Sequence, residues 1–250
     1  MADTKSARIL IGGITGGIGQ ALAQQLLEQG HSVSGFARDA SKLQAFATDF
    51  PKAQVYEVDA HDAAAVQGVV DAVTEDGPLD GYAHAIGSIL IKPLAALKPE
   101  EFEDTLSLNL GTAFKALKAV VPALQKSKGS AVFFSTVAAR TGLANHEAIA
   151  AAKAGVEGMV RSAAASLALR GVRINAVAPG MTDTPLAAPL LQSDSTRKAS
   201  EAMHPLGRIG RPEEIASLAA WLLSAHAGWV TGQIMSVDGG LSTVTPRPRT

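Results

Sequence analysis

The sequence of 250 residues has no cysteine and is poor in aromatic residues, which make up 4% of it. The lack of cysteine excludes disulfide bonds and thiolate metal sites. The histidines show no metal-ligand spacing, so we expect no metal, and we interpret His61, His204 and His226 as structural or solvent-facing residues.

Long apolar runs and an excess of charge of one sign are also missing. No run of eighteen apolar residues occurs, so we expect no membrane-spanning helix and no membrane partner. Residues 1–8 are polar and no apolar signal-peptide core follows them, which favours a cytoplasmic location. The net charge is −1 and no basic stripe is visible, so we expect no nucleic-acid partner.

Short β-branched runs alternate with longer segments that are rich in alanine and leucine. This alternation predicts right-handed βαβ crossovers and a parallel sheet with helices on both faces. The fold class is therefore α/β, a Rossmann-type doubly wound sheet of seven strands in three layers. We expect one dinucleotide-binding domain over residues 1–250, with a loose, Pro- and Arg-rich tail at 245–250.

The predicted elements can be placed by their composition and their turn residues. The strands are expected at 8–12, 32–37, 53–58, 79–85, 130–135, 172–178 and 233–237. The helices are expected at 17–29, 41–48, 62–74, 99–125 with a kink at Pro122, 147–170 and 212–224. Residues 185–206 form the least regular interior stretch and are interpreted as a lid or substrate loop.

A glycine-rich string joins the first strand to the first helix. Glycine permits a tight turn there, lets the backbone approach a pyrophosphate and lets helix and strand pack closely, while the helix N-terminus offers free N–H groups. A glycine string alone is a weak signal, but its place between strand and helix is the context that dinucleotide binding requires. We therefore expect cofactor contacts from Gly13, Thr15, Gly16, Gly17, Ile18 and Gly19.

The residue after the second strand bears on the choice of cofactor. A site for NAD usually has an acid there for the ribose 2′-OH, whereas this strand ends at Ala37 and Arg38 follows. The guanidinium can pair with a 2′-phosphate, which favours NADP(H) over NAD(H). Asp39 comes one residue too late and is suited to cap the next helix.

These segments resemble the short-chain dehydrogenase/reductase family over almost the whole chain. The turn fits the motif TGxxxGIG, although Gly12 stands in place of its threonine, and Val237-Asp238-Gly239-Gly240 fits the terminal VDGG. The resemblance implies that Asn109 holds a water in a proton relay and that Lys153 binds the ribose and lowers the pKa of the catalytic acid. It also implies cofactor contacts from Asp59, Ala60, Ala85, Ile86, Gly87, Pro179, Gly180, Thr182 and Thr184.

One departure from the family concerns the proton donor. The family's tyrosine, four residues before the lysine, corresponds to Ile149, which has no proton to give. The family's serine corresponds to Thr136, which keeps a hydroxyl. Tyr56 and Tyr82 fall in other strands and are no obvious substitutes.

His146 is the candidate substitute. The enoyl-acyl-carrier reductase branch of the family has its tyrosine seven residues before the lysine, and His146 occupies that position. Histidine titrates near neutral pH, so it can supply or relay a proton; alternatively it caps the helix or lines the pocket. Arg140, in the loop after the fifth strand, is interpreted either as an anion-recognising or as a solvated side chain.

Two functions remain open. The first is an NADP(H)-dependent oxidoreductase that transfers hydride to or from a carbonyl or activated double bond of a small molecule, with Asn109, Thr136, His146 and Lys153 as catalytic residues. The second is an NADP(H)-binding protein with little or no catalysis, a sensor or an assembly partner. The family resemblance also implies a homo-oligomer, with a tetramer favoured over a dimer.

Overall fold

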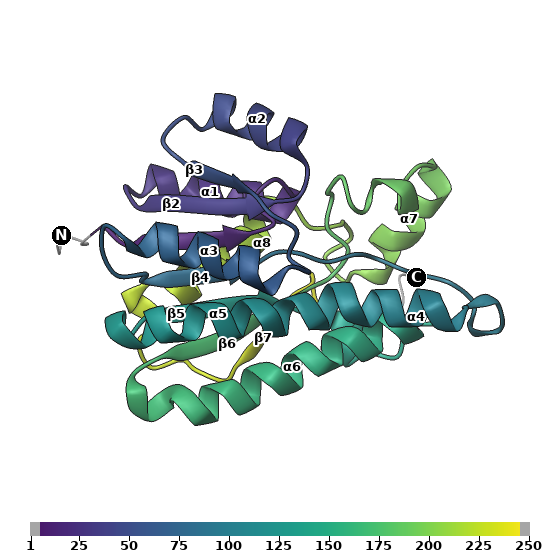
Figure 1. The fold of residues 1–250 in the computed structure, drawn as a ribbon. Coiled ribbons are helices and arrows are strands. Elements are labelled where there is room, and N and C mark those ends of the chain that lie inside the picture. The colour runs from purple at the N-terminus through teal and green to yellow at the C-terminus, as the bar shows by residue number, and fades with distance from the viewer. Residues whose placement is uncertain (1–5, 246–250) are drawn as a thin grey trace.

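The computed structural model describes residues 6–245, and the predicted tail lies outside them except for Thr245. Seven parallel strands form one sheet in the order β3-β2-β1-β4-β5-β6-β7, which confirms the predicted Rossmann-type fold (Figure 1). The strands are β1 (Arg8–Gly12), β2 (Ser32–Ala37), β3 (Gln54–Glu57), β4 (Gly81–His84), β5 (Ser130–Phe134), β6 (Arg173–Pro179) and β7 (Ile234–Val237).

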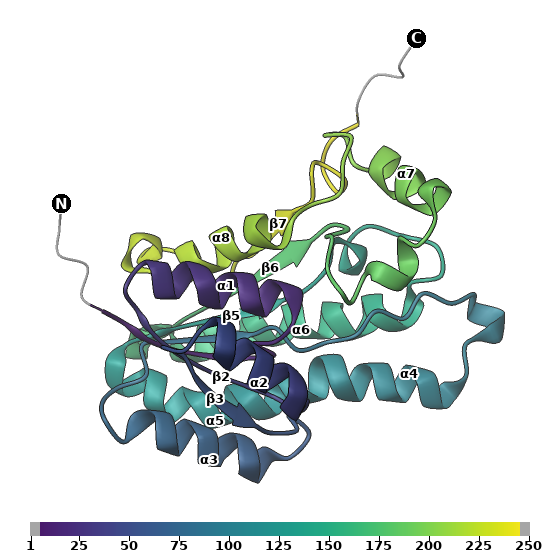
Figure 2. The same ribbon diagram turned by 90° about the horizontal axis from the view of Figure 1, so that it is seen from above.

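Helices cover both faces of this sheet, as Figure 2 shows from above. The helices on one face are α1 (Gly17–Glu28), α2 (Ala40–Asp49) and α8 (Pro212–Leu223), and those on the other are α3 (Ala63–Thr74), α5 (Thr112–Ser127) and α6 (Glu147–Leu167). Further helices are α4 (Pro99–Leu106) and α7 (Asp194–Met203), with 3-10 turns at 94–96, 137–139, 168–170, 188–190 and 225–227.

The two faces of the sheet bury two separate hydrophobic cores. Neighbouring residues of a strand point to opposite faces, so Ile9 and Ile11 pack under α1 and α8, whereas Leu10 packs under α3 and α5. All five residues of β5 are buried, which explains its continuous apolar sequence. Each large aliphatic side chain buried in this way contributes about 1.5–3 kcal/mol to stability.

The helix expected at 99–125 is interrupted, but not at Pro122. α5 continues through Pro122, and the irregular segment is a π-helical turn at Ser107–Gly111 between α4 and α5. Within this region the Asn109 side chain donates to the Thr105 carbonyl and the Thr112 hydroxyl donates to the Leu108 carbonyl. These bonds compete with the regular backbone pattern, which accounts for the turn.

The stretch 185–206 is more regular than its composition suggests, because it contains α7. This helix is mostly polar and has no buried residue, and Ser193 and Thr196 begin it as a capping box. Figure 2 shows α7 standing apart from the layers of the sheet, at the end where the strands finish. Within residues 6–245, no helix combines the length and hydropathy that crossing a bilayer requires.

Candidate functional site

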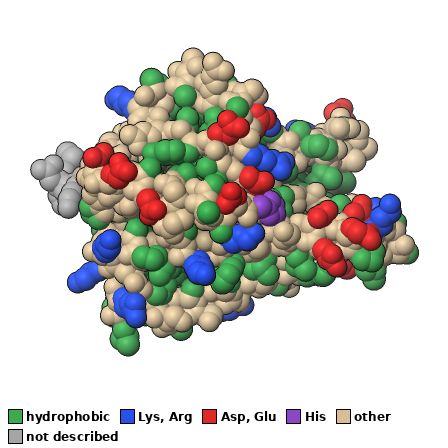
Figure 3. All heavy atoms as spheres, in the orientation of Figure 1, with side chains coloured by type: hydrophobic (Ala, Val, Ile, Leu, Met, Phe, Trp, Pro, Cys, Tyr) green, Lys and Arg blue, Asp and Glu red, His purple; other side chains and the backbone are tan. Residues whose placement is uncertain are grey.

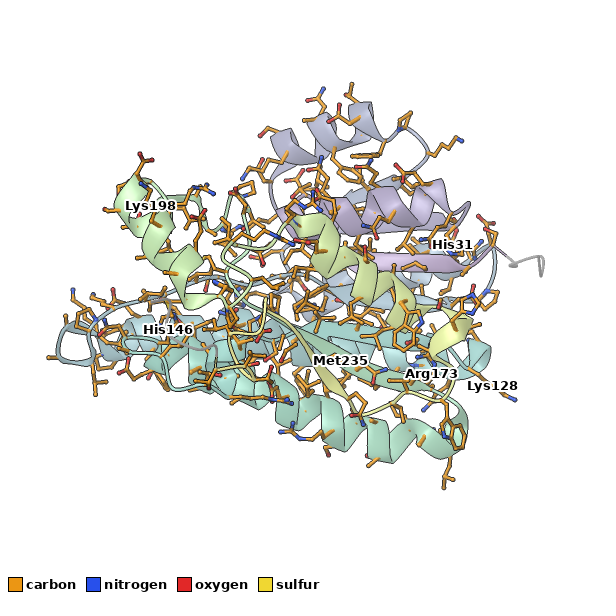
Figure 4. The ribbon with its side chains drawn as sticks, turned by 180° about the vertical axis from the view of Figure 1, so that it is seen from behind. His31, Lys128, His146, Arg173, Lys198 and Met235 are labelled. Atoms are coloured by element: carbon orange, nitrogen blue, oxygen red, sulfur yellow. The ribbon has the colours of Figure 1, made fainter. Side chains whose placement is uncertain are left out.

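A cavity of about 450 Å³ opens at the carboxyl ends of β4, β5 and β6. This edge of an open parallel sheet is where ligands bind in doubly wound folds. Figure 4 shows His146 and Lys198 at this end of the molecule and His31 and Arg173 at the other. The wall is mostly aliphatic, with side chains that include Ile89, Ile91, Leu143, Ile149, Met181, Leu186, Leu190, Met203 and Leu241.

The glycine-rich turn lies beside this cavity and is closely packed. Gly13 has φ +81°, and its N–H donates to the Phe36 carbonyl at 2.8 Å. A Cβ on Gly13 would lie 2.9 Å from the Ala85 backbone, and one on Gly19 would lie 2.2 Å from the Gly13 carbonyl oxygen. A Cβ on Gly17 would meet Thr184 at 2.9 Å. These glycines therefore have no room for a side chain.

The start of α1 is suited to bind an anion. Its N-cap residue is Gly16, no side chain caps the helix, and no acidic side chain lies in its first turn. The free N–H groups and the helix dipole there favour a phosphate group. Thr15 is half-buried in this turn and Ile18 lines the cavity, so the predicted cofactor residues of the turn surround one corner of it.

The predicted adenosine contacts lie beyond the cavity wall, at the carboxyl ends of β2 and β3. The Arg38 side chain is exposed and makes no ion pair within the described part of the chain. Asp39 caps α2, as expected, because its carboxylate accepts from Lys42 N at 3.1 Å and from Ser41 Oγ at 2.7 Å. Asp59 is exposed and accepts from His61 N, while Ala60 is buried. No acid is therefore free at the end of β2.

Lys153 and Asn109 meet behind the segment that follows β4. A Cβ on Gly87 would lie 2.6 Å from Asn109 Oδ1 and 3.1 Å from Lys153 Nζ. Ser88 helps to hold the Asn109 side chain in this position. Its N–H donates to Asn109 Oδ1 at 3.1 Å, and its hydroxyl accepts from Asn109 Nδ2 at 3.0 Å. Asn109 is completely buried and is not part of the cavity wall, whereas Lys153 is.

The ammonium group of Lys153 is in an unfavourable environment. The residue is 7% exposed, and its Nζ has no hydrogen bond or ion pair to any residue within 6–245. Burial lowers the pKa of Lys153 to about 8. The charged form of Lys153 would be stabilised by a nearby hydrogen-bond acceptor or negative charge, such as ribose hydroxyls or a developing oxyanion.

Thr136 and Ile149 lie on the same cavity wall. Thr136 Oγ1 accepts from Ala138 N at 3.3 Å and caps the short turn Val137–Ala139, so its hydroxyl proton is available for a ligand. Ile149 is 5% exposed and lies one helical turn before Lys153 on α6. At the place that the resemblance assigns to tyrosine, the wall is therefore aliphatic.

His146 precedes the first residue of α6 and also lines the cavity. Its Nδ1 is 2.7 Å from the Ala144 carbonyl oxygen, which can only accept, so Nδ1 carries a proton. In the neutral ring Nε2 is then an acceptor, and in the cation Nε2 is a donor. The histidine of the cavity wall can thus exchange a proton through Nε2.

The segment after β6 forms the opposite wall, with Pro179, Gly180, Thr182 and Thr184. His204 joins this segment to α7: its Nε2 accepts from Met181 N at 3.1 Å, and its Nδ1 donates to the Ser200 carbonyl at 2.7 Å. His204 is 3% exposed, so it is structural, whereas His61 and His226 face solvent. Among residues 6–245, no group of three or more His, Cys, Asp and Glu side chains is arranged to hold a metal ion.

Arg140 is 43% exposed, in keeping with a solvated side chain, but its guanidinium also pairs with a buried carboxylate, which neither interpretation includes. Arg140 Nε donates to Glu157 Oε2 at 2.8 Å, and Glu157 Oε1 accepts from Ser135 Oγ at 3.0 Å. Glu157 is 3% exposed. The only sequence signal for this pair is a glutamate four residues after Lys153, on the buried face of a helix. The pair anchors the loop that carries Thr136 to α6.

The surface seen in Figure 3 carries charges of both signs. Lysine and arginine side chains are interspersed with acidic ones, and the acidic ones gather over α4, whose sequence contains Glu100, Glu101, Glu103 and Asp104. The charge of this face is therefore mixed.

Known proteins are similar to the chain over nearly its whole length. A family model described as enoyl-(acyl carrier protein) reductase matches residues 13–242. The 3-oxoacyl-(acyl-carrier-protein) reductases FabG of Vibrio cholerae and Thermotoga maritima are both 35% identical, and each match covers 93% of this chain and 96% of the relative.

Two solved structures share the fold. A short-chain type dehydrogenase/reductase from Mycobacterium ulcerans is 29% identical with a TM-score of 0.91, and the match covers 96% of this chain and 90% of that one. A variant of actinorhodin polyketide ketoreductase with NADPH is 28% identical with a TM-score of 0.91, and the match covers 98% and 100% of the two chains. The chain therefore belongs to the short-chain dehydrogenase/reductase family.

Proposed function

We propose that the protein is an NADP(H)-dependent oxidoreductase that transfers hydride to or from a carbonyl group or an activated double bond. The observation that carries this proposal is the placement of Lys153, Thr136 and His146 on the wall of one apolar cavity, opposite the segment 179–184. Three groups able to hold or move a proton thus face the same space. The reductases named above support a reaction of this class.

The binding site for the dinucleotide fits the residues that are present. Gly13, Gly17 and Gly19 leave a cradle that a Cβ would fill, next to the uncapped start of α1. The phosphates would lie there, with the nicotinamide end toward Gly87, Lys153 and Thr184 and the adenosine toward Asp59. When bound, the cofactor supplies or accepts a hydride.

The cofactor is NADP(H) rather than NAD(H) because of the residues after β2. Arg38 is exposed and free to pair with a 2′-phosphate, while Asp39 is engaged as the cap of α2. The ketoreductase structure that resembles this chain holds NADPH, which agrees with this assignment. Arg38→Ala should therefore weaken NADPH binding much more than NADH binding.

Proton transfer is assigned to His146 in place of the family's tyrosine. In reduction, the imidazolium gives its Nε2 proton to the substrate oxygen as hydride reaches carbon, and in oxidation the neutral Nε2 takes that proton back. The Thr136 hydroxyl donates a hydrogen bond to the same oxygen. The ammonium of Lys153 stabilises the negative charge that develops on it.

The substrate is an apolar, uncharged molecule. Apart from Lys153, His146 and His204, the cavity wall contains no titratable side chain, and aliphatic residues dominate it. Burying a charged group against that wall would carry a large desolvation penalty. The stretch 185–206 is proposed as a lid, because Leu186, Leu190 and Met203 belong to the wall.

A second function is an NADP(H)-binding protein with little catalysis. Ile149 favours it, because the wall beside Lys153 carries no acid at the family's position. A positioned acid is worth about 10²–10⁴-fold in rate, so its loss without a substitute would leave binding and almost no turnover.

Two measurements test the proposal. Purified protein is titrated with NADPH and NADH by fluorescence, and oxidation of the reduced cofactor is then followed with a panel of neutral ketones and enones. Tight NADPH binding with turnover supports the oxidoreductase, and tight binding without turnover on any compound supports the second function. Failure to bind either cofactor would refute both.

Variants test the proton donor. His146→Ala should lower the rate by about 10²-fold or more, whereas the exposed His226→Ala serves as the matched control and should be silent. Equal turnover of His146→Ala and the unmodified protein would refute the assignment. A gain of activity in Ile149→Tyr would show that the rest of the site is intact.

We propose a homotetramer in solution, on the basis of the family resemblance alone. Light scattering of the purified protein tests this assembly, and a monomer would refute it.

A further inference from the structure

Two polar side chains of β4 are buried in the interior and have no part in the mechanism above. Tyr82 is fully buried and His84 is 2% exposed, and both point to the face of the sheet that α3 and α5 cover. Figure 1 shows β4 in the middle of the sheet, between β1 and β5. Polar groups at such a place are retained only if every donor and acceptor is satisfied.

The hydrogen bonds of these residues run in one direction. The Thr112 hydroxyl donates to the Leu108 carbonyl, so Thr112 Oγ1 can only accept from His84 Nε2, which lies at 3.1 Å. His84 therefore carries its proton on Nε2. Its Nδ1 is then an acceptor, and the Tyr82 hydroxyl donates to it at 2.7 Å.

The two ends of this chain of hydrogen bonds reach different parts of the proposed site. The Tyr82 hydroxyl lies 2.9 Å from the place of a Cβ on Gly12, at the entrance to the glycine-rich turn. At the other end, Leu108 belongs to the π-helical turn that carries Asn109. Asn109 in turn holds Ser88 by two hydrogen bonds.

His84 is unsuited to be an acid or base itself. It is not part of the cavity wall, and both ring nitrogens are occupied by buried partners. Burial, together with the charge of Lys153, lowers the pKa of His84 to about 3, so the ring stays neutral at any working pH. A neutral ring with a fixed tautomer acts as a rigid connection between the groups on either side of it.

We propose that His84 is a positioning residue: as the neutral Nε2–H tautomer it links the glycine-rich turn to the π-helical turn and so holds Asn109 against Gly87 and Ser88. This inference rests on the proposed function, because Gly87, Asn109 and Lys153 are placed there at the nicotinamide end of the site.

Paired variants separate positioning from simple packing. In His84→Gln the amide nitrogen can replace Nε2 as donor to Thr112, whereas in His84→Asn the shorter side chain can replace only Nδ1 as acceptor for Tyr82. Thr112→Val breaks the same connection with a side chain of the same shape, and it keeps the test open if His84→Asn fails to fold. NADPH affinity, kcat and KM are measured for each folded variant.

We expect kcat to fall about tenfold or more in His84→Asn and in Thr112→Val, because a small misplacement of reacting groups is enough for such a loss. NADPH affinity should change about threefold or less, since most phosphate contacts lie in the glycine-rich turn. His84→Gln should restore kcat to within about threefold of the unmodified protein, because it keeps the donor to Thr112. Equal kcat values for the Gln and Asn variants, impaired or not, would overturn the proposal.

Nitrogen-15 NMR gives a readout that needs no turnover. The His84 ring should show a protonated Nε2 and an unprotonated Nδ1 between about pH 5 and 9, and a titrating ring or an Nδ1–H tautomer would overturn the proposal. The Asn109 side-chain amide and Ser88 N–H signals should shift in Thr112→Val and stay in place in His84→Gln; unshifted signals in Thr112→Val would overturn it as well. Absence of turnover in the unmodified protein would refute the proposed function alone.

Discussion

Replacing Lys153 by methionine should make the protein more stable at neutral pH. Methionine has nearly the length of lysine and no charge, and the Lys153 side chain lies in an apolar setting without a described partner for Nζ. Removing a charge that the fold destabilises should raise the free energy of unfolding. The same change should abolish turnover, because the proposed site loses its cation.

The magnitude follows from the pKa of Lys153. Burial lowers this pKa from 10.5 to about 8, which corresponds to about 3 kcal/mol between the protonated and neutral forms. The unfolded chain binds the proton more tightly than the folded one. The free energy of unfolding of the unmodified protein therefore rises with pH between about 8 and 10.5. This gain in free energy is lost again as the pH falls from 10.5 through 8, where the buried Lys153 becomes protonated in the folded protein.

Urea denaturation of the apoprotein measures the effect. At pH 7 the Lys153→Met variant should exceed the unmodified protein by about 3 kcal/mol in free energy of unfolding. This difference should shrink by about 1.4 kcal/mol for each pH unit above 8 and vanish near pH 10.5. Lys118→Met makes the same change of charge on the exposed surface of α5, and its difference from the unmodified protein should be small at every pH.

Two results would refute the reasoning. A Lys153→Met variant no more stable than the unmodified protein at pH 7 would show that the ammonium is not destabilised by burial. A difference in stability that is the same at pH 7 and pH 10 would show that packing of the methionine, and not the titration of Lys153, is responsible.

Three further predictions concern stability and cofactor binding. Arg173 donates to four carbonyls, among them Leu222 O at 2.8 Å, so Arg173→Met should lower the free energy of unfolding by about 2 kcal/mol in urea denaturation, and an unchanged midpoint would contradict this. Arg140→Met should lower the free energy of unfolding by about 1–2 kcal/mol, because the partner carboxylate of Glu157 is buried while the guanidinium is 43% exposed. It should also lower kcat, and a change in stability without a change in kcat would show that this ion pair does not position the proposed site. Gly13→Ala should weaken NADPH binding about tenfold or more by titration, because its φ is +81° and a Cβ would strike the Ala85 backbone, whereas Gly142→Ala meets nothing within 4 Å and is the control; equal affinities would refute the placement of the cofactor.

The residues of the proposed site differ in how visible they are in the sequence. Gly13, Lys153 and Thr184 stand in motifs with fixed spacing to a strand or a helix end, and the fold brings them to one edge of the sheet. Their approach follows from topology, because parallel strands all end at that edge. Whether they act as proposed remains a prediction for the experiments above.

Polar pairing depends on tertiary structure instead. Glu157 meets Arg140 only because α6 packs against the loop after β5, and His84 meets Thr112 only because β4 lies beneath α5. No periodic pattern in the sequence predicts either pair, because the two members of each pair lie far apart along the chain and belong to different elements. The sequence therefore indicates a solvated or anion-recognising Arg140 but does not reveal that Glu157 is its partner.

The sequence by itself determined the alternation of strands and helices, the glycine-rich turn and the aliphatic Ile149 at the position that the resemblance assigns to tyrosine, because periodicity, turn chemistry and residue identity are local properties. Only the tertiary structure decided that residues of α7 line the cavity, that a π-helical turn and not Pro122 interrupts the long helix, and which nitrogen of His84 and His146 carries the proton. These features depend on hydrogen-bond partners and packing surfaces that the fold alone brings together.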